Sequence, residues 1–262
     1  MNAVRVAAKA VLATADIFLP RLGGPRILIY HQVGSGRTHE MNVELRAFCQ
    51  HIDWMQNHGK VISLDEAVKR RGEPNADRLF VITFDDGYAD VFHNAFPVLR
   101  EFKLPFTLYL TSGPTENLEL FRDWPGEPLS WRQVETMLES NLVTIGAHTN
   151  THCDLRNIDS ISALQEIETS NALIEARTGV KPRHFTYPWG RWAPVADAIV
   201  RAAYETATLG SGSGISIDSD LHTLHRLPIQ RSDPMLLFRG KITNGGRTED
   251  QLRRRIHRYN GP

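Results

Sequence analysis

Two adjacent carboxylates followed by a glycine form the first group of residues that could do chemistry. They stand in the sequence Thr83-Phe84-Asp85-Asp86-Gly87, directly after an apolar, β-branched run. In an extended strand, neighbouring side chains point to opposite faces, but where a strand breaks into a loop both carboxylates can face one cavity. A solvated acidic turn explains the same residues, since Asp and Gly are ordinary turn residues. The motif by itself leaves both interpretations open.

Two histidines four residues apart form the second group, in the sequence His148-Thr149-Asn150-Thr151-His152. This separation lets both imidazoles reach one ion from a helical turn or a tight loop. Together with the aspartates that follow another predicted strand, the pair favours a metal site of two histidines and one aspartate. A divalent ion there would acidify a bound water and polarise an amide carbonyl, and the second aspartate could accept the proton as a general base.

Short β-branched and aromatic runs alternate with helical patterns along the chain. The runs that predict buried strands are residues 26–31, 79–84, 106–110, 142–147, 184–187 and 224–229. This alternation predicts a mainly parallel sheet, closed or nearly closed into a barrel, with its chemistry at the carboxyl ends of the strands. The two aspartates, His148, Pro188 and His31 each follow or end one of these runs.

Three helices are predicted from apolar periodicity and capping residues. The first begins after Asn42 and ends at Gly59, and the second begins after Asp159 and ends at Gly179. Ser130 is expected to cap a third helix that begins at Trp131. The first helix is expected to bury Leu45, Phe48, Ile52 and Met55, and the second Ile161, Leu164, Ile167 and Ile174.

The composition is that of an ordinary soluble globular domain, with 262 residues, 41% of them hydrophobic. Thirty basic and thirty acidic side chains give a formal net charge of zero, which excludes the basic balance typical of nucleic-acid-binding proteins. The only two cysteines, Cys49 and Cys153, lack the spacing of a zinc or redox motif and are expected to be reduced thiols.

Residues 1–25 are interpreted as an amphipathic N-terminal segment, residues 26–245 as the catalytic domain and residues 246–262 as a basic tail. Arg5, Lys9 and Asp16 interrupt the apolar residues near the N-terminus. The uncharged run 10–15 is shorter than the ~7–15 residues of a signal-peptide core and the ~20 residues of a membrane span. We therefore predict a cytoplasmic protein whose N-terminal helix packs on the body; the alternatives are a helix that lies on a membrane surface and a poor signal peptide.

The motifs TFDDG (83–87), HTNTH (148–152) and FTYPWG (185–190) resemble the first three motifs of the polysaccharide deacetylase family, the NodB-type carbohydrate esterases. Ile29-Tyr30-His31-Gln32-Val33 upstream is similar to members that begin with a Tyr-His strand, and the resemblance covers roughly residues 26–230. It implies a distorted (β/α)7 barrel related to the TIM barrel. It also implies metal-dependent hydrolysis of N-acetyl groups on an amino sugar or polysaccharide in envelope or exopolysaccharide metabolism.

The same resemblance assigns roles to the residues of the first two motifs. Asp85 would be the general base, and Asp86, His148 and His152 would bind one divalent ion. Zinc is the default ion, although related enzymes accept other divalent transition metals. The substrate would be a carbohydrate. The substrate and oxyanion side would be formed by Tyr187, Pro188, Trp189, Gly190 and Trp192, with the Trp189 backbone N–H as an oxyanion donor.

Two parts of the family pattern remain open in this chain. The general acid that protonates the leaving amine is expected to be His31 on the first strand, with His225 in a late Leu-His pair as the alternative. Many relatives carry an arginine in the third motif that pairs with the catalytic aspartate, whereas this chain has Thr186. The arginines considered as substitutes are Arg183, Arg191 and Arg226.

Three rival functions use the same residues differently. Hydrolysis of O-acetyl esters or of amides on a non-sugar small molecule keeps the fold, and an assay for free amine separates these from sugar N-deacetylation. A carbohydrate-binding pseudoenzyme is disfavoured because Asp85 is present. A glycosidase that uses Asp85 and Asp86 as its carboxylate pair fails on geometry, because neighbouring residues seldom span the ~5–9.5 Å that such chemistry requires.

Overall fold

The computed structural model describes residues 23–121, 124–210, 212 and 214–244. Apart from residues 23–25, the predicted N-terminal segment and the basic tail lie outside these residues, so both stay predictions. Cys49 and Cys153 are free thiols, as expected. Within the described ranges, no helix combines the length and the apolar character that crossing a membrane requires.

The centre of the fold is a curled sheet in which all neighbouring strands are parallel, in the order β10-β1-β5-β6-β7-β8-β9. The strands β1, β5, β6 and β7 span Arg26–Tyr30, Leu79–Phe84, Phe106–Leu110 and Val143–Ala147. The strands β8, β9 and β10 span His184–Thr186, Thr206–Thr208 and Leu227–Pro228. The fully buried runs of β1, β5 and β6 suit a parallel sheet with both faces covered.

Three short strands complete the β-structure. β4 (Lys60–Val61) pairs with β5 beside the main path of the sheet, and β2 (Gln32–Val33) and β3 (Asn42–Val43) form a separate parallel pair. None of these was predicted, and neither was β9. Each has only two or three residues, too few for a periodic pattern to appear.

One segment joins the two edges of the sheet. Leu224 forms a parallel bridge with Thr208 of β9, and three residues later Leu227 pairs with Leu28 of β1. The Leu224 N–H donates to Ala207 O at 2.9 Å, and the Leu209 N–H donates to Leu224 O at 2.8 Å. Residues 224–228, which we call the seam, therefore lie between both edges. The predicted barrel, closed or nearly closed, is confirmed.

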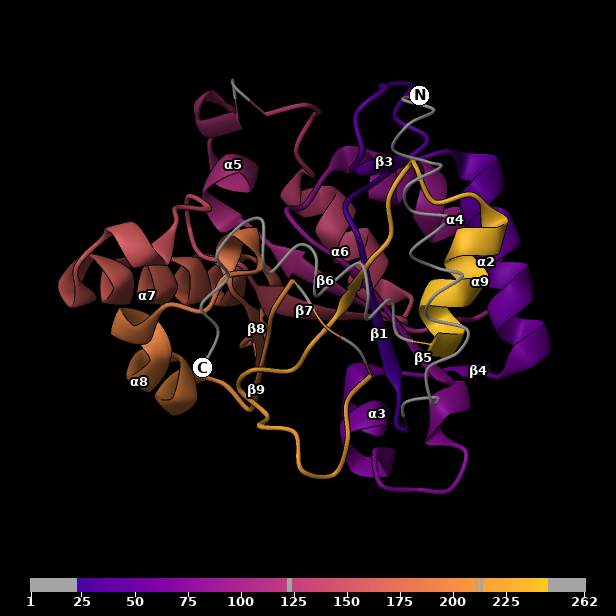
Figure 1. Cartoon of the computed structure of the whole chain (residues 1–262). Helices are drawn as coiled ribbons and strands as arrows, with labels where there is room; N and C mark the ends of the chain where they lie inside the picture. Colours follow the sequence, from indigo (N-terminus) through magenta and orange to yellow (C-terminus); the bar gives the residue numbers. More distant parts are fainter. Residues whose placement is uncertain (1–22, 122–123, 211, 213, 245–262) are drawn as a thin grey trace.

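Helices surround the sheet, with α2, α4 and α9 on one side and α7 and α8 on the opposite side (Figure 1). The bounds of the first four helices are α2 Leu45–His58, α3 Leu64–Arg70, α4 Phe96–Glu101 and α5 Ser112–Glu116. The others are α6 Trp131–Glu139, α7 Ser160–Thr178, α8 Pro194–Ala203 and α9 Met235–Asn244. Ser130 caps α6 in a capping box with Gln133, and Gly179 ends α7 in the left-handed conformation, both as predicted.

The predicted buried faces of α2 and α7 need correction. Leu45 is 38% exposed at the first position of α2, while Phe48, Ile52 and Met55 are buried as expected. On α7, Ile161 is 70% exposed and Leu164 39% exposed. The buried side chains of α7 are Ala163, Ile167, Ser170 and Ile174. Because two residues correspond to about 200° around a helix, Ile161 faces away from Ala163.

Candidate active site

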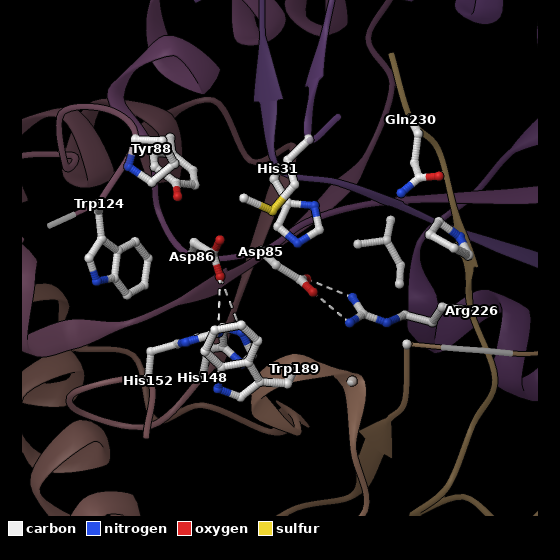
Figure 2. A pocket seen from close by; sticks show the side chains of 16 residues that line it. His31, Asp85, Asp86, Tyr88, Trp124, His148, His152, Trp189, Arg226 and Gln230 are labelled. Carbon is white, nitrogen blue, oxygen red and sulfur yellow. Dashed lines mark hydrogen bonds and ion pairs between the residues drawn. The ribbon is translucent and has the colours of Figure 1, made fainter. Parts of the chain in front are cut away.

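A cavity of about 470 Å³ lies at the carboxyl ends of the strands. His31 follows β1, Asp85 and Asp86 follow β5, and His148 follows β7, and all four side chains line this cavity (Figure 2). The chain brings them together because the carboxyl ends of parallel strands meet at one rim of a barrel. The carboxyl ends of the strands, where the chemistry was predicted, therefore line this cavity with polar side chains.

Asp86, His148 and His152 form a compact cluster of metal-ligand type. Asp86 Oδ1 lies 3.3 Å from His148 Nε2 and 3.4 Å from His152 Nε2. One ligand atom from each of the three residues lies within 4.8 Å of the others. Two imidazole nitrogens and one carboxylate oxygen are a donor set for divalent zinc and related transition ions, and three protein ligands leave a position open.

The hydrogen bonds around His148 indicate that this cluster fits a cation. His148 Nδ1 lies 2.8 Å from the Thr186 carbonyl oxygen. Because a carbonyl only accepts, Nδ1 carries the hydrogen, which leaves Nε2, the nitrogen that faces Asp86, as the atom that can bind an ion. Asp86 Oδ1 is buried and makes no hydrogen bond with any described residue. Two lone pairs that face each other in a buried site repel unless a cation lies between them.

The charges in the cluster also favour a ligand role. Burial alone would raise the pKa of Asp86, but contact with His148 and the nearby His31 and His152 hold this pKa below its ordinary value. Burial lowers the pKa of His152 to about 4. At neutral pH, Asp86 is therefore ionised and His152 is neutral, which are the protonation states that bind metal ions.

Non-glycine residues in the left-handed backbone region gather around the cavity. Asp86, Thr149, His152 and Trp189 have φ values of 75°, 63°, 60° and 62°. Such conformations cost about 1–3 kcal/mol each and persist only where the surroundings hold them in place. The backbone is thus held in a strained form at the points where it presents the carboxylate, the histidines and the indole.

Asp85 forms a buried, bidentate ion pair with Arg226 on the seam. Arg226 Nη1 donates to Asp85 Oδ1 at 2.7 Å, and Nη2 donates to Oδ2 at 2.6 Å. The remaining N–H groups of the guanidinium donate to Thr83 Oγ1, Thr186 Oγ1 and Leu209 O. All five donors of the fully buried Arg226 therefore have acceptors. Burial would raise the pKa of Asp85, but the charge and hydrogen bonds of Arg226 hold it below its ordinary value.

The pair of Asp85 and Arg226 identifies the arginine that takes the place of the one missing from the third motif. Arg183 binds Asp65 and Glu205 instead, and Arg191 binds Asp154. Thr186, at the position where an arginine was expected, accepts a hydrogen bond from Arg226 Nη2 at 2.7 Å. Of the three arginines considered, Arg226 is the partner of Asp85.

The predicted substrate residues divide into two groups. Trp189 and Gly190 line the cavity, and so does Trp124. The His152 ring lies 5.1 Å from the Trp124 ring and 5.2 Å from the Trp189 ring. The Trp189 side chain is 58% exposed, so its indole is accessible at the mouth of the cavity. Figure 2 shows both indoles beside the metal-ligand cluster.

Tyr187, Pro188, Trp192 and His225 do not line the cavity. Tyr187 is buried with its ring 5.2 Å from Phe185, Pro188 is buried, and Trp192 donates its indole N–H to Asp197 at 2.9 Å. His225 packs against Gly212, because successive side chains of an extended segment point to opposite sides and Arg226 points inward. His31 is therefore the general-acid candidate that the structure brings to the cavity.

The sequence did not identify several residues of the cavity wall. They are Ile29, Met41, Tyr88, Pro125, Gly210, Pro228 and Gln230. Alternation along extended chain was a usable signal for three of them: Ile29 precedes His31 by two positions, and Pro228 and Gln230 follow Arg226 at steps of two. The others lie on loops, where no periodicity indicates which side chains turn inward.

A parallel α/β barrel with an Asp-His-His cluster and a buried aspartate at its carboxyl end has the architecture of a barrel hydrolase. The chain belongs to the polysaccharide deacetylase family, whose model matches residues 72–207, more than half of the sequence. It is accordingly a hydrolase of the carbohydrate deacetylase class.

Known proteins of similar sequence and fold agree with this assignment. The Bacillus subtilis protein YxkH is 23% identical over 207 residues, which cover 78% of this chain and 70% of YxkH. The poly-beta-1,6-N-acetyl-D-glucosamine N-deacetylase of Staphylococcus epidermidis is 27% identical over 172 residues, 60% of this chain and 57% of that protein. The enzyme of that name from Escherichia coli is 29% identical over 125 residues, which are 43% of this chain and 18% of that enzyme. The chain spans less than two thirds of the length of both N-deacetylases.

Among solved structures, IcaB from Ammonifex degensii matches with a TM-score of 0.70 and 23% identity, over 85% of this chain and 97% of that chain. The deacetylase PplD from Streptococcus pyogenes matches with a TM-score of 0.69 and 19% identity, over 88% of this chain and 99% of that chain. At these identities the likeness shows a common fold, the NodB-like barrel.

Proposed function

We propose that this protein is a divalent-metal-dependent N-deacetylase that hydrolyses acetamido groups of an amino-sugar polymer in envelope or exopolysaccharide metabolism. The observation that carries the proposal is the pairing, in one cavity, of the Asp86-His148-His152 cluster with an ionised aspartate, Asp85. The names of two relatives, poly-beta-1,6-N-acetyl-D-glucosamine N-deacetylases, support an N-acetylated glucosamine polymer as the substrate class.

Asp86, His148 and His152 would hold the ion, with zinc as the first choice because the donor set is two nitrogens and one oxygen. A bound divalent ion supplies Lewis acidity that polarises the acetamide carbonyl and acidifies water. Asp85 accepts the proton of the attacking water. Its carboxylate has about four lone-pair sites, of which Arg226 occupies two, so hydrogen-bonding capacity toward the cavity remains.

His31 and the third motif, residues 185–190, supply the general acid and the oxyanion donor. The His31 ring is turned into the cavity close to Asp85 (Figure 2), where it can donate a proton to the departing amine. The Trp189 backbone N–H serves as the oxyanion donor. The indoles of Trp124 and Trp189, on two sides of His152, offer apolar faces for neighbouring sugar rings of a polymer.

The test combines metal analysis with two product assays on wild type, Asp85→Asn and His148→Ala. Amine release is measured from β-1,6-linked N-acetylglucosamine oligomers, and acetate release from an O-acetylated sugar. Wild type should hold about one ion per chain and release amine. Asp85→Asn should retain the ion and lose about 10²–10⁴-fold in rate, and His148→Ala should lose both ion and activity.

Two results would contradict the proposal in different ways. Wild type that takes up no divalent ion under any loading condition would remove the metal mechanism and make a carbohydrate-binding role the leading hypothesis. Release of acetate from esters without release of amine would replace the N-deacetylase by an O-acetyl esterase. The cytoplasmic location and the membrane contact of residues 1–25 rest on the sequence alone, and fractionation of cells that express the full chain tests them.

A further inference from the structure

The segment that carries both histidine ligands is not a helical turn. We call residues 148–152 the histidine loop. Thr149 and His152 both have positive φ, and the His152 N–H donates to Thr149 Oγ1 at 3.0 Å. A loop with two non-glycine residues in the left-handed region does not keep this conformation by itself. Contacts from the rest of the barrel must hold it.

A single carboxylate on α7 makes three of these contacts. Glu166 Oε2 accepts the backbone N–H groups of Asn150 at 3.0 Å and of Thr151 at 2.8 Å. The Thr151 hydroxyl donates to Glu166 Oε1 at 2.8 Å. Two of the three bonds fix the main chain, at two positions between His148 and His152. Hydrogen bonds to an ionised carboxylate are about twice as strong as neutral ones.

The opposite side of the histidine loop rests on the start of α5. The Ser112 N–H donates to Thr149 O at 3.3 Å, and the Gly113 N–H donates to Asn150 O at 2.8 Å. A Cβ on Gly113 would lie 2.5 Å from Asn150 O, so only glycine permits this approach. The backbone of the histidine loop is thus held by hydrogen bonds on both sides: α5 supplies N–H donors, and Glu166 supplies acceptors.

We propose that Glu166 is a positioning residue of the metal centre, which holds the histidine loop in its ligand-bearing conformation before an ion binds. This inference rests on the proposed metal-dependent function. Glu166 touches neither the ion site nor the cavity. It acts by fixing the backbone between His148 and His152, so that binding an ion does not require the loop to be ordered first.

The experiment compares Glu166→Ala with Glu168→Ala in the full-length protein. Glu168 lies on the same helix, is exposed, and makes no hydrogen bond or ion pair with a described residue, so its variant controls for loss of a glutamate from α7. Metal-free proteins are titrated with Zn²⁺ against a chromophoric chelator to give dissociation constants, and the Co²⁺ absorption spectrum reports ligand geometry.

Glu166→Ala should bind Zn²⁺ about 10–100-fold more weakly than wild type, while Glu168→Ala should match wild type. Glu166→Gln should recover part of the affinity, because an amide oxygen still accepts both N–H groups. If Glu166→Ala does not fold, Glu166→Met and Glu168→Met provide the same comparison, because Met removes both acceptor oxygens and keeps the length of the side chain. Equal affinities within each pair would overturn the inference and leave the proposed function standing. Wild type that binds no ion would overturn both.

Discussion

Replacing Arg226 with Met removes the charge that balances Asp85 while keeping an unbranched, apolar side chain on the seam. Arg226 is fully buried and uses both terminal nitrogens on Asp85, at 2.7 and 2.6 Å. At an effective dielectric constant of about 20, unit charges about 4 Å apart attract by about 4 kcal/mol. Removing one partner of a buried pair costs about 3–5 kcal/mol, because the other charge stays desolvated. We expect Arg226→Met to lower the free energy of unfolding by about 4 kcal/mol.

The assay is urea unfolding of the metal-free proteins at neutral pH, followed by circular dichroism. A double-mutant cycle separates the charge from the packing: Arg226→Met is measured in wild type and in an Asp85→Asn background. A neutral amide needs no counter-charge, so the cost of Arg226→Met should be about 2 kcal/mol smaller there. Arg191→Met is the matched control, because Arg191 is partly exposed and contacts Asp154 at 3.3 Å. It should cost about 1 kcal/mol or less.

The reasoning fails if Arg226→Met costs the same in both backgrounds. Equal costs would mean that the side chain stabilises the seam by packing alone and that Asp85 does not depend on the guanidinium. The reasoning also fails if Arg191→Met and Arg226→Met destabilise the protein equally, since a buried ion pair would then contribute no more stability than a partly exposed one.

Three further predictions test other parts of the structure. Thr186→Val, which leaves a donor of buried Arg226 without its acceptor, should cost about 1–3 kcal/mol of unfolding free energy by urea titration, whereas Thr186→Ser should cost less. His184 and Arg183 hold the pKa of Asp65 well below its ordinary value, so this carboxylate stabilises the fold above the unfolded pKa of about 3.9. The stability gap between wild type and Asp65→Asn, measured by thermal unfolding, should therefore narrow as pH falls below about 4, and a constant gap would contradict the assignment. Chelation of an ion present at 100 times its dissociation constant should remove about 2.7 kcal/mol of stability, and an unchanged melting temperature would argue against a native metal site.

Much of the fold could be predicted from local pattern. The runs 79–84 and 106–110 coincide with β5 and β6, because long apolar, β-branched stretches bounded by polar residues are recognisable without tertiary context. The candidate metal ligands could be predicted because imidazole pairs at this spacing are chemically specific. β9 could not be predicted, because Thr-Ala-Thr becomes a strand only by pairing with β8 and with the segment around Leu224.

The partners of the site residues depend on contacts that no local pattern contains. Asp85 and Arg226 are 141 positions apart, and three arginines were equally eligible in the sequence. Glu166 looks in the sequence like any glutamate on a helix, and only the fold places it beside the histidine loop. The choice between His31 and His225 depended on which face of an extended segment turns inward, and the inward position of Arg226 determines this.

The seam both closes the barrel and supplies the partner of Asp85. Leu224 reaches β9, Leu227 reaches β1, and Arg226 between them neutralises Asp85. Without this segment, the β9 and β1 edges of the sheet would both be unpaired, and the Asp85 carboxylate would have no counter-charge. Closure of the barrel and pairing of Asp85 therefore depend on the same five residues, 224–228.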